Sequence, residues 1–160
     1  MTDVEQDKRF INMCITLAAG NIQQKSGGPF AAIVVKDGAV VATGVNCVTA
    51  TNDPTAHAEI EVIRKACKVI NNYQLTGCTL YANCEPCPMC LGAIYWARPE
   101  KVVYAATRQS AAKAGFDDAF IYEEMERPFP ERTIKMYHFP AENSELPFEL
   151  WKKSEGKKLY

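Results

Sequence analysis

The sequence predicts an α/β fold, a three-layer α/β/α sandwich with a central mixed five-stranded sheet. Segments rich in Val and Ala alternate along the chain with segments whose apolar residues recur at helical spacing. One pair of strands flanks a tight turn, which makes that pair antiparallel, whereas later strands are separated by helices. The length of 160 residues, with 48% hydrophobic and 23% charged residues, is typical of one globular domain. We therefore expect residues 1–160 to form a single domain.

The first third of the chain predicts a helix followed by a hairpin. The helix is indicated by apolar residues at helical spacing, namely Phe10, Ile11, Cys14, Leu17, Ala18 and Ile22. It ends before the Gly27-Gly28-Pro29 break. Strands over 30–36 and 39–45 flank Asp37-Gly38, the strongest short hairpin signal in the chain.

The remaining elements follow from caps, prolines and apolar runs. Asp53 is a candidate N-cap and Pro54 a candidate first helical residue, so a helix is expected to begin just before His57. Pro86 is expected to open a further helix that runs to about Trp96. Strands are predicted over 79–83, 101–105 and 133–139, and further helical segments over 109–125, broken near Gly115, and near Trp151.

Composition limits the partners and the compartment. No apolar run approaches the length of a membrane-spanning helix, and the acidic, mixed N-terminus does not resemble a signal peptide. We therefore expect a cytoplasmic protein that has no membrane partner. The net charge of −1 argues against a protein that grips a nucleic-acid backbone. Three of the seven cysteines crowd into residues 84–90, which in a reducing compartment favours metal binding or chemistry over disulfides.

Two motifs carry the chemistry. His57-Ala58-Glu59 and the Pro-Cys-Pro-Met-Cys run at 86–90 together form the H-x-E…P-C-x-x-C pattern of zinc deaminases. A catalytic zinc takes three protein ligands and leaves its fourth position for water, and His57, Cys87 and Cys90 supply three. Cys87 and Cys90 share one face of a predicted helix start, where the helix dipole favours the thiolates that zinc requires. We expect one Zn²⁺ per subunit.

Glu59 is expected to be the catalytic residue and not a fourth ligand. A zinc ion saturated by protein ligands would have no place for the water that the reaction needs. Zinc lowers the pKa of a bound water, and a carboxylate beside it can take that proton. Glu59 would then deliver protons to a ring nitrogen and to the departing amine.

The motifs also leave structural alternatives open. A C-x-x-C pair alone is as typical of a structural zinc site or a redox pair as of a catalytic zinc site. A closed structural zinc site would need Cys84 or His138 as its fourth ligand. An iron–sulfur run would need a further cysteine soon after Cys90, where the sequence has Leu-Gly-Ala.

The chain resembles the cytidine deaminase-like superfamily and, within it, the short guanine deaminases of the bacterial type. The resemblance covers nearly the whole length and is carried by the metal motifs and by residues 27–30, 52–59, 85–93 and 114–118. It implies hydrolytic deamination of guanine to xanthine and ammonia, in purine catabolism or salvage. Departures from the family are Asn83, where serine is common, and Ala31, where glycine is common.

The same resemblance implies the substrate contacts and the assembly. Phe30 would pack against the purine, Asn46 would hydrogen-bond the ring, Ala58 would offer a backbone contact and Asp118 would bind the guanine edge. A homodimer is implied in which about residues 140–160 cross to the partner, so that Tyr160 closes the neighbour's pocket and Trp96 forms part of its wall. From the residues alone, Phe30 and Trp96 could instead be core, Asp117 and Asp118 could cap a helix, and the tail could be frayed.

Other functions remain open at this point. The same zinc chemistry serves guanosine, cytosine and tRNA adenosine deaminases. A non-catalytic zinc-binding module is a further alternative, although such a module has no use for Glu59.

Overall fold

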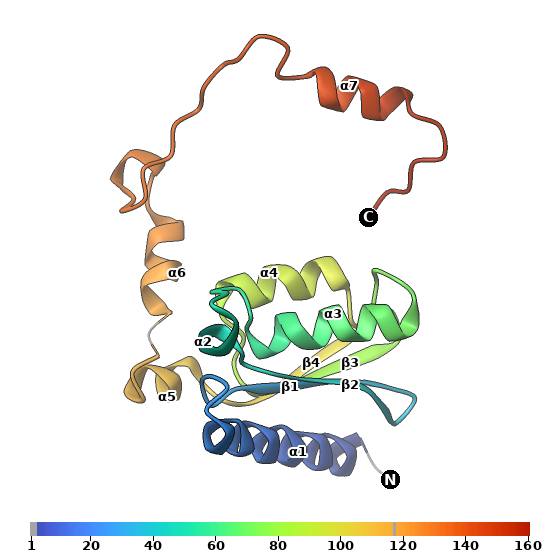
Figure 1. Cartoon of the computed structure of the whole chain (residues 1–160), viewed down its shortest axis with the longest axis vertical. Coiled ribbons are helices and arrows are strands. Elements are labelled where there is room, and N and C mark those ends of the chain that lie inside the picture. Colours follow the sequence, from blue (N-terminus) through green and yellow to red (C-terminus); the bar gives the residue numbers. More distant parts are fainter. Residues whose placement is uncertain (1–2, 117) are drawn as a thin grey trace. The chain divides into compact units, whose positions relative to one another are not determined.

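The computed structural model describes residues 3–116 and 118–160, and the chain divides into two units. The first unit spans Met1–Ala119 and contains the sheet and its helices (Figure 1). The second unit spans Phe120–Tyr160. In the part of the chain that is described, no helix combines the length and apolarity needed to cross a membrane.

The sheet of the first unit has four strands in the order β2-β1-β3-β4. They are β1 (Ala31–Lys36), β2 (Ala39–Val45), β3 (Cys78–Cys84) and β4 (Lys101–Ala106). The sheet is mixed, because β1 pairs antiparallel with β2 and β3, whereas β3 and β4 are parallel. The hairpin prediction is confirmed: Asp37 and Gly38 join β1 to β2 with φ of 50° and 75°, as a tight two-residue hairpin turn requires.

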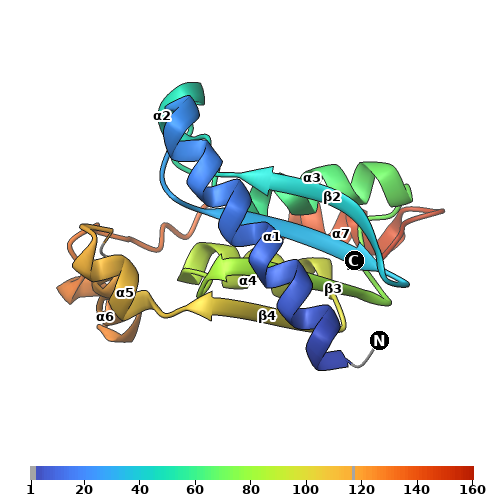
Figure 2. The ribbon, with the colours of Figure 1, turned by 90° about the horizontal axis from the view of Figure 1, so that it is seen from below.

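Helices cover both faces of this sheet, as Figures 1 and 2 show. α1 (Asp3–Gln24) crosses one face, and α3 (Ala58–Ile70) and α4 (Pro88–Ala97) cover the other. Successive β1 side chains point to opposite faces, so the central strand contributes to two cores. Ile33 and Val35 pack with residues of α1, while Ala32 and Val34 pack with residues of α3 and α4. The predicted α/β fold with three layers is confirmed.

The buried face of α1 differs in one position from the predicted apolar stripe. Its buried residues are Phe10, Cys14, Ala18 and Asn21, and Ile22 is 55% exposed. Phe10 packs against Tyr81 of β3 with ring centroids 5.2 Å apart. Asn21 thus occupies the last buried position of the helix, next to the loop that leads to β1.

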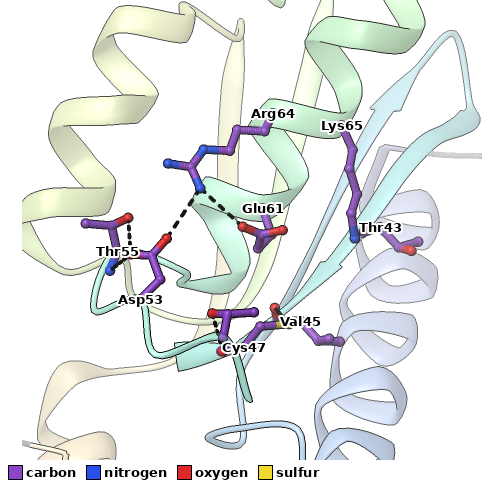
Figure 3. Close-up of polar contacts among 9 residues, drawn as sticks. Thr43, Val45, Cys47, Asp53, Thr55, Glu61, Arg64 and Lys65 are labelled. Atoms are coloured by element: carbon purple, nitrogen blue, oxygen red, sulfur yellow. Dashed lines mark hydrogen bonds and ion pairs between the residues drawn. The ribbon is translucent and has the colours of Figure 1, made fainter. Parts of the chain in front are cut away.

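Two sets of predicted helix-start residues do not begin their helices. Asp53 does not cap α3; its carboxylate accepts hydrogen bonds from the amide and hydroxyl of Thr55, at 2.8 and 2.7 Å, and so closes a turn (Figure 3). Arg64 of α3 lies 4.0 Å from the same carboxylate. The helix begins at Ala58, and a short helix α2 (Val48–Thr51) precedes the turn. Likewise α4 begins at Pro88 and not at Pro86. Either proline fits a helix start, so the local signal did not distinguish between them.

The predicted fifth strand over 133–139 is also wrong, and the described sheet has four strands instead of five. A strand is stabilised by pairing, and these residues pair with no other strand. The backbone amide of Thr133 donates instead to the carboxylate of Glu124, at 2.6 Å, and Ile134 and Tyr137 are 79% and 85% exposed. The other late elements are confirmed: α5 (Arg108–Lys113) and α6 (Ala119–Glu126) are separated at Gly115, and α7 (Leu146–Lys153) contains Trp151.

Candidate metal centre and active site

Three predicted metal ligands converge in the first unit. The donor atoms of His57, Cys87 and Cys90 all lie within 4.8 Å of one another. The Sγ atoms of Cys87 and Cys90 lie 3.6 and 3.5 Å from Nδ1 of His57. A nitrogen and a sulfur bound to one tetrahedral zinc ion at ordinary bond lengths would be about 3.6 Å apart. The three side chains therefore fit a zinc ion, with Nδ1 as the histidine donor.

The ligands are positioned by two helix starts. His57 and Cys87 are the N-cap residues of α3 and α4, and their carbonyls accept the first helical hydrogen bonds from Glu61 and Leu91. Neither side chain caps its own helix, so both are available to the metal. Cys90 follows in the first turn of α4, on the face that Cys87 begins. The positive dipole ends of α3 and α4 thus lie at His57 and Cys87, and the end of α4 favours the thiolate form of its cysteines.

The two thiols have different proton affinities. The hydrogen bond from the Cys90 thiol, reinforced by His57, lowers the pKa of Cys87 to about 4. The same interaction with Cys87, together with burial, raises the pKa of Cys90. The hydrogen bond with Cys87 also raises the pKa of His57. A coordinating cation displaces a thiol proton outright, so zinc would bind both sulfurs as thiolates.

Glu59 lies beside the three donors and outside their group. It is in the first turn of α3, is 8% exposed, and accepts a hydrogen bond from the Cys90 thiol at 3.5 Å. Burial raises the pKa of its carboxyl. A buried carboxyl with a raised pKa is suited to accept and return a proton.

Among the described residues the cysteines form no disulfide, and no fourth side chain joins the three metal donors. All seven cysteines are free thiols, so Cys87 and Cys90 are not a disulfide here. Cys84, a candidate fourth ligand, donates to the carbonyl of Thr107 at 3.7 Å and is not among the metal donors found in the described residues. His138 belongs to the second unit.

Aromatic residues meet near the start of β1. The rings of Phe30 and Phe116 pack edge to face, with centroids 4.9 Å apart and an interplanar angle of 84°. A Cβ on Gly28 would lie 3.1 Å from the Phe30 ring and 3.2 Å from the Phe116 ring, so this glycine packs directly against both. The sequence assigned no role to Phe116, although it lies in the 114–118 motif. The motif placed Phe116 close in sequence to Asp118, but only the fold shows that its ring contacts Phe30.

Asn46 is buried with its amide orientation determined by its neighbours. Its Oδ1 accepts hydrogen bonds from the backbone amides of Gly28 and Val48, at 3.0 and 3.3 Å. Asn21, which the sequence did not single out, donates through Nδ2 to the carbonyls of Gly28 and Asn46, at 2.8 and 2.9 Å. The oxygen of the Asn46 side chain is thus occupied by two backbone amides.

The remaining predicted contact residues have the following positions. Ala58 is buried next to His57, and Asp118 is close enough to raise the pKa of His57. Asp117 lies outside the described residues. Trp96, on α4, is 63% exposed, so the alternative in which it is core is wrong. Tyr160, in the second unit, is 72% exposed.

Comparisons with known proteins agree with this geometry. The family described as "Cytidine and deoxycytidylate deaminase zinc-binding region" matches residues 4–106. The chain is 55% identical to a guanine deaminase of Bacillus subtilis (strain 168) over 151 residues, 94% of this chain and 97% of that protein. A crystal structure of guanine deaminase from Bacillus subtilis superposes with a TM-score of 0.95 at 52% identity, covering 100% of this chain and 99% of that one.

A second relative acts on a different kind of substrate. A tRNA-specific adenosine deaminase of Aquifex aeolicus (strain VF5) is 35% identical over 131 residues, 81% of this chain and 84% of that protein. The match to the family includes all three donors and Glu59. Its three donors converge at two helix starts, within the matched residues. The chain therefore belongs to the cytidine and deoxycytidylate deaminase zinc-binding family.

Proposed function

We propose that this chain deaminates guanine with water, giving xanthine and ammonia. The observation that carries the proposal is the convergence of His57, Cys87 and Cys90 beside the buried carboxylate of Glu59. The near full-length similarity to a guanine deaminase supports the choice of substrate.

In this proposal Glu59 moves the protons. His57, Cys87 and Cys90 would hold a zinc ion, which would supply a water of lowered pKa. Glu59 would accept the first proton of the attacking water and deliver it to a ring nitrogen of the purine. Glu59 would then carry the second proton of the same water to the amine, which leaves as ammonia while a carbonyl remains on the ring.

Four residues of the first unit would hold the purine. Phe30 presents an aromatic face on which a purine can stack, and Asn46 offers its Nδ2 to a ring acceptor. Asp118 can accept hydrogen bonds from the adjacent ring N–H and amine of guanine, since a carboxylate accepts two donors side by side. Ala58 offers a backbone contact beside His57.

The proposal includes a homodimer in which residues 140–160 cross to the partner. Within Phe120–Tyr160 no residue is buried, although large apolar side chains are frequent there. Apolar surface of this extent is normally covered by another chain. On α4, Tyr95 and Trp96 are 74% and 63% exposed, which suits a partner's segment lying against Trp96. In the exchanged dimer, Tyr160 would close the neighbouring pocket.

We place this enzyme in the cytoplasm. Cys87 and Cys90 must remain reduced to bind zinc, and a reducing compartment keeps them so.

A substrate panel tests the function directly. The purified, zinc-loaded protein is incubated separately with guanine, guanosine, adenine, cytosine and tRNA, and ammonia release is measured. We expect release from guanine above all others. Release from tRNA alone would contradict the proposal and favour the activity named for the relative of Aquifex aeolicus.

A further inference from the structure

One side chain from β3 holds the backbone on both sides of Phe30. Oδ1 of Asn83 accepts a hydrogen bond from the amide of Ala31 at 2.7 Å, and its Nδ2 donates to the carbonyl of Pro29 at 3.0 Å. Pro29 and Ala31 are the chain neighbours of Phe30. The amide group therefore bridges the residue that carries the aromatic ring.

This bridge continues the sheet beyond its last backbone pair. The ladder between β1 and β3 ends at Ala32 and Ala82. One residue further, a side-chain amide supplies one acceptor and one donor, as a peptide group does. The segment before β1 is thereby tied to β3 by two hydrogen bonds, although Pro29 has no amide proton to offer.

Asn83 also lies on the strand that leads to the metal donors. It is the penultimate residue of β3, and Cys87 follows shortly after that strand ends. On the N-terminal side of Pro29, the chain is held by Asn46, whose Oδ1 accepts a hydrogen bond from the amide of Gly28. The backbone carbonyl of Phe30 itself accepts a hydrogen bond from the amide of Asn46 at 3.0 Å. Asn83 is therefore one direct link between the segment that carries the Phe30 ring and the strand end that precedes Cys87.

We propose that Asn83 is a positioning residue, which holds the Phe30 ring in the plane that a purine stacks on. The inference rests on the proposed function, because it uses Phe30 as the stacking residue. Asn83 acts through Phe30 and does not touch the reacting atoms. Its effect is on substrate affinity, since stacking holds the ring of the substrate before and during the reaction.

The first test compares two substitutions of the same kind. In Asn83→Ser the side chain is too short to reach both Pro29 and Ala31. We expect this variant to raise KM for guanine about tenfold, with kcat within about twofold of the parent value. Asn72→Ser is the matched control, because Asn72 also accepts a backbone hydrogen bond, from Gln74 at 3.0 Å, in an exposed turn. The control should leave KM unchanged. Zinc content should stay at the parent level in both variants.

The second test separates positioning from general structural damage. Phe30→Leu and the double variant Phe30→Leu/Asn83→Ser complete a thermodynamic cycle. Once the ring is absent, Asn83→Ser should change KM by less than about twofold. If Asn83→Ser raised KM by the same factor with and without Phe30→Leu, the positioning role would be overturned. A loss of kcat and of zinc at unchanged KM would overturn it as well.

Failure of this inference is distinguishable from failure of the proposed function. If the parent protein deaminates another compound of the panel instead of guanine, the proposed substrate is wrong and the same cycle is measured with that compound. If guanine is deaminated and Asn83→Ser behaves as the parent, only the role of Asn83 is wrong. If no compound of the panel is deaminated, both are overturned.

Discussion

The thiol of Cys90 donates a hydrogen bond to the carboxylate of Glu59, with Sγ and Oε2 3.5 Å apart, although the two residues belong to different helices. This contact places the proposed proton carrier against one metal donor. Glu59 is not one of the three donors that converge, which leaves its carboxylate for proton transfer.

Replacing this carboxylate should abolish turnover without removing the metal. We expect Glu59→Gln to lower kcat by about a hundredfold to ten-thousandfold, because the amide cannot accept and return a proton. Zinc content and the thermal unfolding temperature should stay near the parent values. Glu61→Gln, on the same helix and paired with Arg64 at 3.3 Å, is the control and should remain active. Full activity in Glu59→Gln would remove Glu59 from the mechanism.

The three-donor site predicts different outcomes for two buried cysteines. Cys90→Ala should leave less than one zinc ion per chain, measured by elemental analysis, because two donors hold the ion weakly. Cys84→Ala should keep the full complement, since the Cys84 thiol donates to a carbonyl. Loss of zinc in Cys84→Ala would indicate a closed site with four protein ligands.

The approach of α3 to β2 depends on a glycine. A Cβ on Gly44 would lie 2.5 Å from the Ala58 carbonyl oxygen and 2.7 Å from the Val62 amide nitrogen. Gly44→Ala must push the start of α3 outward, and we expect the free energy of unfolding to fall by about 1–3 kcal/mol. Urea unfolding measures this. Gly92→Ala, where a Cβ on α4 meets nothing within 4 Å, should instead stabilise by up to about 1 kcal/mol.

An ionic contact between α1 and the sheet predicts a pH-dependent stability. Asp7 accepts a hydrogen bond from the Tyr81 hydroxyl and pairs with Lys101, both at 2.6 Å. The contact with Lys101, followed by that with Tyr81, lowers the pKa of Asp7 from its ordinary 3.8. The contribution is therefore complete above the unfolded pKa and is lost as the pH falls through the lower folded pKa.

The variant Asp7→Asn measures this contribution. We expect it to cost about 1–2 kcal/mol at pH 6, since both bonds lose their charge. The difference from the parent protein should begin to shrink as the pH falls below about 4, near the unfolded pKa, and should vanish only below the lower folded pKa of Asp7. A difference that stays constant from pH 6 to pH 3 would show that the charge of Asp7 plays no part.

The end of the chain should affect turnover more than metal binding. Deleting residues 157–160 should raise KM for guanine and lower kcat, with zinc content unchanged. If the tail crosses to the partner, co-expressing the deletion with full-length Glu59→Gln should restore activity. The mixed dimer would have one site with both an intact Glu59 and a partner's tail. Unchanged kinetics of the deletion would show that Tyr160 has no role in the pocket.

Features that depend on residues close together in the chain could be predicted from the sequence. The Asp37-Gly38 turn was identified because its backbone geometry is a property of two adjacent residues. The spacing of Cys87 and Cys90 within one helical turn likewise predicted two donors on one face. Where several local signals were equally good, as with Pro86 and Pro88, the helix start was wrong. Over 133–139 the local residue types were not enough, because a strand requires a partner that the sequence does not specify.

The sequence by itself determined the chemistry of the centre, since only certain residue types can bind zinc or carry a proton. The tertiary structure decided which atoms meet. It brought Nδ1 of His57 to two thiols some 30 residues away, at 3.6 and 3.5 Å. It also placed the Asn83 amide across Phe30, which lies on another strand. Contacts of this kind depend on the packing of the helices and of a strand end against the sheet. No short-range pattern encodes that packing, because it is set by all the residues of both cores together.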